Sequence, residues 1–319
     1  MVCPPKSLVL AIVLLAVAVN EFTSARRHVL NRSWTVRWTV GGSPGDTTLV
    51  LPLQLAADDS ELYVLDPRAH GITALSLMTG KVLWRYSDIA HPLQLPTTVA
   101  ARIEGGAIVA DAFLHQLLLF DQNGRVVSQV PYMDGYVHAI CDLGDNSYLA
   151  VVERSALPLV WIDSAGGTKK RTSMPWGADE TSRIASQTTL ARGSERRCLL
   201  SQQLGGHFAV LSKNGKGWAR EYIRDRASWL DKLMGRPFYQ TALTSTFDSA
   251  FVAVAAWGHS RYARKAIDLY SADSGSYRGT IILPFRVFWM VFARGNYYVI
   301  HGRNGIPEVS ALSTKEASQ

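Results

Sequence analysis

The stretch ITALSLMTGKVLWRYS, residues 72–87, contains two alternating apolar segments separated by a turn at Met78-Thr79-Gly80. Followed back to Leu51, the same pattern gives four strand-like segments, at 51–57, 61–65, 72–77 and 81–86. The sequences between them are rich in Asp, Ser, Pro and Gly, which favour turns. The region is therefore expected to form a small antiparallel sheet of four strands.

This four-strand pattern recurs along the chain. The copies span 51–87, 96–131, 136–172, 185–222, 241–283 and 286–313, and the last holds only three strands. The glycines of the third turn, Gly80, Gly124, Gly166, Gly215 and Gly275, lie 44, 42, 49 and 60 residues apart. Glycine suits this place because a short hairpin turn requires positive φ. Sheets of this size at this period are typical of the blades of a β-propeller.

The segment SWTVRWTV, residues 33–40, alternates strongly but has no partner strand next to it in the sequence. It would supply the outer strand that the sixth copy lacks, so that no sheet edge is left unpaired. The sequence thus predicts an all-β fold, a six-bladed β-propeller of four-stranded antiparallel blades over residues 26–319, closed by an N-terminal strand. An insertion at 222–240 is expected to form a short amphipathic helix on the rim, with a partner-docking element as the alternative.

The first 25 residues have the features of a signal peptide. Lys6 precedes a twelve-residue apolar run at 8–19, and Thr23-Ser24-Ala25 offers small residues for cleavage. The run is short for a membrane span. We therefore expect export to the periplasm or the extracellular space. The alternative is an envelope module anchored by an uncleaved N-terminal segment, which is the one case in which a membrane would be a partner.

Composition and cysteine content narrow the function classes. The net charge is +7, but the basic residues are scattered, so nucleic acid is not expected as a partner. After cleavage only Cys141 and Cys198 remain, without a C-x-x-C motif. We expect both to be unpaired, buried small side chains, and we expect no cofactor, no metal and a monomeric chain.

Two segments carry a family resemblance. ELYVLDPRAHGITALS and GAIVADAFLHQLLLFDQNGRVV resemble the NHL-type repeat, in which a strand ends in Val-x-Asp before a tight turn with His. Asp66 and Asp111 hold the acidic position, and Glu153 stands there in the third copy. The segment ALSLMTGKVLW is also similar, more weakly, to the quinoprotein-type repeat. The resemblance implies a propeller whose ligands bind at the face formed by the turns between second and third strands.

The candidate binding residues are the acidic, basic, aromatic and histidine side chains expected around that face. They are Asp66, His70, Arg102, Asp111, His115, Glu153, Arg154, His207, Trp257, His259, Arg261, Tyr262, His301 and Arg303. The five histidines have two interpretations: a ring of imidazoles that binds a ligand or metal, or turn residues that bond to nearby backbone. The second is favoured, because equivalent positions on separate blades seldom converge.

The sequence offers little support for catalysis. The expected inner strands carry almost no carboxylates and only one histidine, His138, and no nucleophile or P-loop motif occurs. The sequence therefore favours a non-catalytic binding or scaffold module that takes a protein, peptide or glycan on one face. The alternative is a metal-dependent hydrolase or lyase of the lactonase kind.

Overall fold

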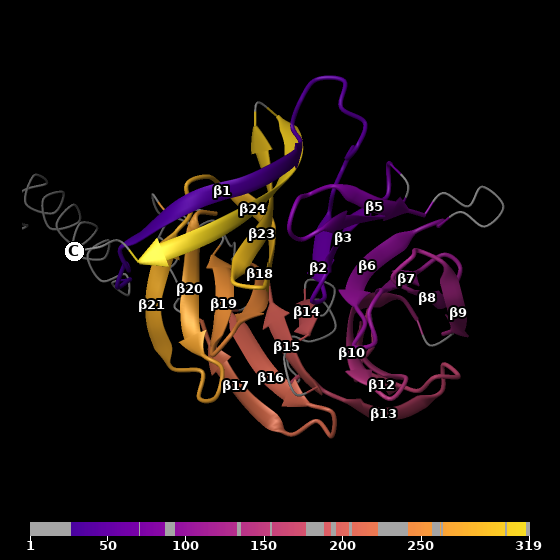
Figure 1. The fold of residues 1–319 in the computed structure, drawn as a ribbon. Coiled ribbons are helices and arrows are strands. Elements are labelled where there is room, and N and C mark those ends of the chain that lie inside the picture. Colours follow the sequence, from indigo (N-terminus) through magenta and orange to yellow (C-terminus); the bar gives the residue numbers. More distant parts are fainter. Residues whose placement is uncertain are drawn as a thin grey trace, which may run out of the picture.

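The computed structural model describes residues 27–69, 71–86, 93–132, 135–153, 155–176, 188–192, 196–203, 206–222, 242–256, 262, 264–303 and 305–316. Over these ranges the chain forms twenty-four strands in six four-stranded sheets. Figure 1 shows the sheets arranged around a common axis. No helix in this part of the chain is long and apolar enough to cross a membrane. The predicted signal peptide and nearly all of the rim insertion lie outside the described residues.

The first three sheets each consist of four strands that follow one another in the sequence. Blade 1 contains β2 (Gln54–Ala57), β3 (Glu61–Asp66), β4 (Gly71–Ser76) and β5 (Val82–Arg85). Blade 2 contains β6 (Pro96–Ala101), β7 (Ala107–Asp111), β8 (Gln116–Phe120) and β9 (Val126–Pro131). Blade 3 contains β10 (Val137–Gly144), β11 (Ser147–Val152), β12 (Leu159–Ile162) and β13 (Thr168–Thr172).

Blades 4 and 5 follow the same plan, whereas blade 6 takes its outer strand from the N-terminus. Blade 4 contains β14 (Thr188–Arg192), β15 (Arg197–Gln202), β16 (His207–Ser212) and β17 (Gly217–Glu221). Blade 5 contains β18 (Ala242–Asp248), β19 (Phe251–Ala256), β20 (Ala266–Ser271) and β21 (Tyr277–Ile282). Blade 6 contains β22 (Val287–Ala293), β23 (Asn296–Arg303), β24 (Ile306–Glu316) and β1 (Arg32–Gly41).

The closing strand confirms the sequence-based expectation. β1 pairs antiparallel with β24 from Arg32 opposite Glu316 to Gly41 opposite Glu308, and Figure 1 shows the two strands side by side. The chain is a six-bladed β-propeller whose sixth blade combines the first and the last strand of the described chain. This sheet is therefore complete only when β1 pairs with β24.

The hydrophobic core is divided among the blade junctions. The buried apolar residues fall into six clusters, and each cluster combines side chains from two adjacent blades. Strand residues that face one way enter one cluster, and the alternating residues enter the next. Burial on both faces explains why the second and third strands are buried along most of their length, and why ELYVLD in β3 is buried throughout.

Four of the five glycines of the third turns pack against tryptophans of the preceding blade. Gly124 has φ +75°, and a Cβ there would lie 2.5 Å from the ring of Trp84 on the outer strand of blade 1. The pairs Gly80–Trp38, Gly215–Trp161 and Gly275–Trp218 repeat this contact at other junctions. These turns therefore require glycine both for the backbone conformation and for the space that the indole occupies.

Residues 27–30 lie against the outer edge of blade 5. Val29 forms a parallel bridge with Thr280, and the backbone N–H of Leu30 donates to the Thr280 carbonyl at 2.7 Å. The Arg27 guanidinium reaches the carboxylate of Asp268, with Nε 3.0 Å from Oδ1 and Nη2 3.2 Å from Oδ2. We call residues 27–30 the N-terminal strap. It ties the start of the described chain to the buried side of β20 and β21.

The ring has two faces, set by the direction of the inner strands β2, β6, β10, β14, β18 and β22. We call the face where these strands begin the inlet face, and the other the outlet face. Because neighbouring strands are antiparallel, the turns between the second and third strands also lie on the inlet face. The turns between first and second strands, and those carrying the packed glycines, lie on the outlet face.

Candidate functional site

The two acidic residues of the repeat motif hold the backbone of the inlet face together. The Asp66 carboxylate is buried and accepts hydrogen bonds from Val50 at 2.6 Å, Leu51 at 3.0 Å and Ala69 at 3.1 Å. Each bond comes from a backbone N–H, either of the linker into β2 or of the turn after β3. Asp66 therefore anchors a linker to a turn and presents no carboxylate to a ligand.

Asp111 plays the same part in blade 2. Its carboxylate, 1% exposed, accepts from the N–H groups of Gln94 at 2.7 Å and Leu95 at 3.2 Å, and from the turn residues Phe113 and Leu114. The resemblance identified a real equivalence between Asp66 and Asp111. The equivalence is structural, because both carboxylates are used by backbone donors.

Three of the predicted histidines are described, and each stacks on an aromatic ring of a linker between blades. His115 lies on Tyr136, His207 on Trp176 and His301 on Phe285, with ring centroids 5.8, 5.7 and 3.8 Å apart. His207 Nδ1 is 3.1 Å from the Gln202 amide oxygen. Each imidazole thus packs against an aromatic ring at a blade junction.

His301 is the most enclosed of these rings. Burial lowers its pKa to about 4, so the imidazole is neutral at neutral pH. Its Nε2 lies 2.8 Å from the Ser310 hydroxyl and its Nδ1 lies 3.1 Å from a Glu308 carboxylate oxygen. A neutral ring that donates from Nδ1 and accepts at Nε2 satisfies both contacts.

Of the remaining predicted residues, one lies on the outlet face, three lie on the inlet side and five lie outside the described residues. Arg102 lies in the β6–β7 turn, where Ala101 pairs with Ala107, and so it belongs to the outlet face. Its placement with the others on one face is wrong, because that turn follows the end of an inner strand. Arg102 bonds there to the Phe120 carbonyl and Glu104. Glu153 and Tyr262 lie on the inlet side, and β23 ends at Arg303.

Five candidates cannot be placed with the rest. His70, Arg154, Trp257, His259 and Arg261 lie outside the described residues, and so does the side chain of Arg303. Among the residues that are described, no group of three or more His, Cys, Asp or Glu side chains could hold a metal ion.

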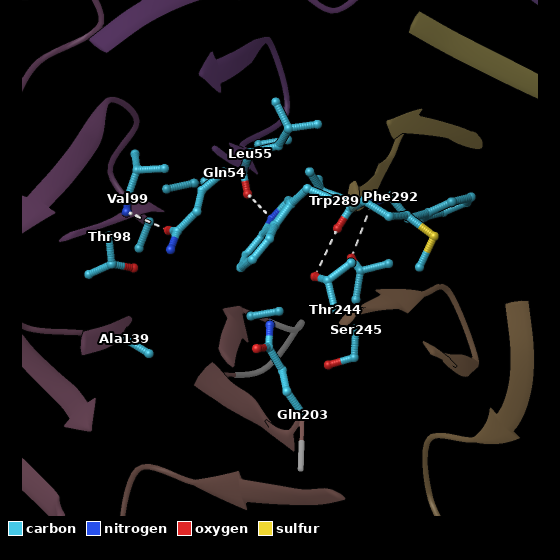
Figure 2. A pocket seen from close by; sticks show the side chains of 18 of the residues that line it. Gln54, Leu55, Thr98, Val99, Ala139, Gln203, Thr244, Ser245, Trp289 and Phe292 are labelled. Atoms are coloured by element: carbon cyan, nitrogen blue, oxygen red, sulfur yellow. Dashed lines mark hydrogen bonds between the residues drawn. The ribbon is translucent and has the colours of Figure 1, made fainter. Parts of the chain in front are cut away.

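A channel runs along the axis between the inner strands and encloses about 240 Å³. Figure 2 shows its wall, with side chains from different blades pointing toward one another. The described lining is dominated by alanine, amide and hydroxyl groups, and His138 is its one titratable side chain. Burial lowers the pKa of His138, and the nearby charge of Glu153 opposes that shift. The part of the channel wall that the structure describes is therefore essentially uncharged at neutral pH.

The polar side chains of the wall connect one blade to the next. The Gln54 amide of β2 donates to the Thr97 carbonyl at 3.2 Å and accepts from the Val99 N–H at 3.2 Å, both in β6. Trp289 Nε1 of β22 donates to the Leu55 carbonyl at 3.2 Å. Figure 2 shows this bond and the bond between Gln54 and Val99. Three more link other junctions: Thr97 Oγ1 to the Val137 carbonyl, Gln203 Nε2 to the Leu243 carbonyl and Thr244 Oγ1 to the Met290 carbonyl.

The junction between blades 3 and 4 is closed by a covalent bond. Cys141 of β10 and Cys198 of β15 form a disulfide, with their Cα atoms 6.2 Å apart. The expectation that both would be unpaired is wrong. The two cysteines are 57 residues apart and meet only because adjacent blades pack there, which their spacing did not reveal. With this bond, a direct link crosses every junction of the ring.

Aspartates near the outlet ends of inner strands add a second set of junction contacts. The Asp142 carboxylate of blade 3 accepts from the Ile103 N–H of blade 2 at 2.7 Å. Asp248 of blade 5 accepts from the Tyr297 hydroxyl of blade 6. Burial raises the pKa of Asp248 and that of Tyr297. These carboxylates therefore bridge neighbouring blades.

Inner strands of four blades carry a register shift near their first residues. The shifts lie between Pro96 and Thr98, Val137 and Ala139, Ala242 and Thr244, and Val287 and Trp289. Such a bulge re-aims the residue that it contains. At the start of β22 the bulged residue is Phe288, whose side chain is 46% exposed.

Sequence reasoning missed an apolar feature of the inlet face. Of the fifteen large hydrophobic side chains exposed in the described chain, eight lie on this side, two lie in outlet turns and five lie on outer strands or the strap. We call the eight the apolar arc. They are Val50, Leu53, Leu95, Phe113, Leu114, Tyr136, Leu157 and Phe288. The signal was visible in the turn DAFLHQ, where two apolar residues occupy the tip of a turn.

The apolar arc spans four consecutive blades, 6, 1, 2 and 3. Single exposed apolar side chains are ordinary, but a gathering on one face marks a contact surface. The stacking of His115 on Tyr136 joins the parts from blades 2 and 3. Exposed basic side chains accompany the arc: Arg286 directly precedes β22 of blade 6, and Arg68 lies in the β3–β4 turn of blade 1. The inlet face can thus bury apolar groups of a partner and attract negative charge.

Comparisons with known proteins identify the fold. No family model and no curated protein matches the chain. Among solved structures, virginiamycin B lyase from Staphylococcus aureus is 9% identical, with a TM-score of 0.54 over 88% of this chain and 99% of that one. The WD40 domain of Toxoplasma gondii coronin is 10% identical, with a TM-score of 0.53 over 92% and 90%. The Neurospora crassa Pan2 WD40 domain gives 10% and 0.51 over 92% and 99%. These likenesses show that the chain has the β-propeller fold.

Proposed function

We propose that this protein is an exported, non-catalytic β-propeller that binds a protein or peptide partner through its inlet face. The apolar arc is the observation that carries the proposal. Phe113 is 66% exposed at the tip of the β7–β8 turn, where contact of its apolar ring with water is unfavourable. Burying such side chains against a partner provides the usual driving force for association.

The channel wall supports a non-catalytic role. Gln54, Gln203, Thr244 and Trp289 already hydrogen-bond to the neighbouring blade. Acid–base chemistry needs titratable groups placed together, and in the described wall His138 is alone in that respect. The polar wall therefore serves ring closure, and recognition falls to the inlet face.

The disulfide supports export. Disulfides persist in the periplasm and outside cells and are rare in the reducing cytosol. Cys141–Cys198 is fully buried at a blade junction, which fits a structural bond formed during folding. N-terminal sequencing of the protein from its native host tests this part. A start near Arg26 is expected, and a mature chain that begins at Met1 would overturn cleavage of the signal segment.

The binding proposal is tested by selecting ligands from a random-peptide display library on the immobilised mature protein. The enriched peptides are then synthesised and titrated against Phe113→Ser and Met78→Ser by fluorescence anisotropy. Met78 is a matched control, because it is also 66% exposed but lies in an outlet turn. Weaker binding to Phe113→Ser alone is expected. Equal affinities for the two variants, or no enrichment of any sequence family, would overturn the proposal.

A further inference from the structure

Three basic residues gather at one end of the apolar arc, where blades 5 and 6 meet. The Arg264 carbonyl accepts from the Val287 N–H at 2.8 Å, which holds the end of the β19–β20 loop against the start of β22. Lys265 Nζ lies 3.4 Å from the Pro284 carbonyl, and Arg286 directly precedes β22. We call Arg264, Lys265 and Arg286 the basic corner.

The basic corner adjoins an exposed aromatic ring. The Arg264 guanidinium carbon lies 5.3 Å from the centre of the Phe288 ring, which belongs to the apolar arc. This contact orients the guanidinium over the ring. Arg264 has a backbone φ of +58°, an uncommon conformation for a residue with a side chain. The backbone of Arg264 is thus held against the start of β22, and its side chain places a cation beside an apolar surface.

Like charges lie close together at this corner. Burial, followed by the positive charge of Arg286, lowers the pKa of Arg264. The exposed Arg286 forms no ion pair with any carboxylate in the described part of the chain. Two guanidinium groups that repel each other on a surface gain stability when an anion enters between them. Arginine suits this role because its planar donors bind a carboxylate in two parallel hydrogen bonds.

We propose that the basic corner binds an acidic side chain of the partner, next to an apolar partner residue that packs on Phe288. This inference rests on the proposed function and specifies the partner: a peptide segment that combines apolar and acidic residues. A free anion would use the cations but leave Phe288 uncovered, so the corner and the arc together favour a peptide over an inorganic ion.

The test uses peptides enriched from the display library and measures their affinity by anisotropy at low and high salt. Arg286→Glu should weaken binding by about 10- to 100-fold, the range for loss of charge-assisted hydrogen bonds. Arg278→Glu is the matched control, because Arg278 is exposed on β21 and the change in net charge is the same. It should change the affinity by less than about twofold.

A charge swap makes the test specific. Replacing the acidic residue of the peptide with lysine should weaken binding to the unmodified protein and restore it to Arg286→Glu. Equal effects of Arg286→Glu and Arg278→Glu would overturn the basic corner, and so would full displacement of the peptide by dilute sodium sulfate. If Phe113→Ser alone abolishes binding, the proposed function stands and this inference fails. If neither variant weakens binding, both fail.

Discussion

Replacing Arg27 with alanine should lower the free energy of unfolding markedly, although Arg27 lies near the start of the described chain. The Arg27 and Asp268 side chains are only 6% and 3% exposed, and their closest contact is 3.0 Å. The Thr280 hydroxyl also donates to the Asp268 carboxylate at 2.5 Å. The alanine variant keeps the Thr280 contact but leaves a carboxylate charge inside blade 5 without its guanidinium.

The size of the effect follows from the burial of this pair. Removing one partner of a buried ion pair costs about 3–5 kcal/mol, because the remaining charge is desolvated without compensation. The Asp268→Asn change removes that charge while keeping an acceptor for Thr280. The double variant should therefore be more stable than Arg27→Ala alone, which gives a coupling energy between the two sites.

Urea denaturation of the mature protein, followed by tryptophan fluorescence, measures these free energies of unfolding. Arg278→Ala is the control, since it removes an exposed arginine from the neighbouring strand β21 and should cost no more than about 0.5 kcal/mol. If Arg27→Ala costs no more than this control, and Asp268→Asn does not restore stability to it, the strap is not held by a buried ion pair.

Three further predictions concern the ring. In urea denaturation, Gly124→Ala should lower the free energy of unfolding more than Gly295→Ala. The two glycines have similar φ values, +75° and +73°, but only at position 124 would a Cβ meet a tryptophan, at 2.5 Å. Equal losses would mean that backbone strain alone explains the cost. Replacing Cys141 and Cys198, 57 residues apart, with alanine should cost about 4 kcal/mol, seen as a lower melting temperature that the reduced natural protein shares. Burial lowers the pKa of His138 from 6.5, so below that pH the unfolded chain binds a proton that the folded chain resists. The melting temperature should therefore fall as the pH is lowered from about 7 to about 5, and it should fall less in His138→Gln. The same pH dependence in both proteins would contradict this.

The architecture could be predicted because each blade repeats a local pattern. Gly80 and Gly124 mark turns whose backbone needs positive φ, and their spacing revealed the period before any contact was known. The strand at 33–40 could be assigned to the last blade because the sixth copy lacked one strand. These inferences rest on local chemistry and on a count of strands, and both can be obtained from the sequence alone.

The contacts between blades could not be predicted in the same way. Cys141 and Cys198 lie in different strand positions of their blades, the first strand of one and the second of the next. Aligning the copies of the repeat by equivalent positions therefore does not place these two cysteines next to each other. The same holds for the partner of Trp84, which is a glycine in the third turn of the following blade. Such pairs depend on how neighbouring sheets are rotated, which no single copy encodes.

The candidate site shows why polar residues in a repeat were a poor guide to recognition. Asp66, Asp111 and His301 were selected because polar groups in turns often bind ligands, yet each is buried and bonded to its own blade or to the linker that enters it. A ring made of six separate sheets needs polar groups to fix its linkers and junctions, because neighbouring blades do not share ladder hydrogen bonds. The repeat therefore places acids and histidines where the ring needs them. Phe113 and Phe288 do not hold linkers or junctions together in this way, and they are exposed on the same face. In this fold an exposed apolar side chain on the inlet face is therefore a stronger indicator of a partner than a polar side chain in a turn.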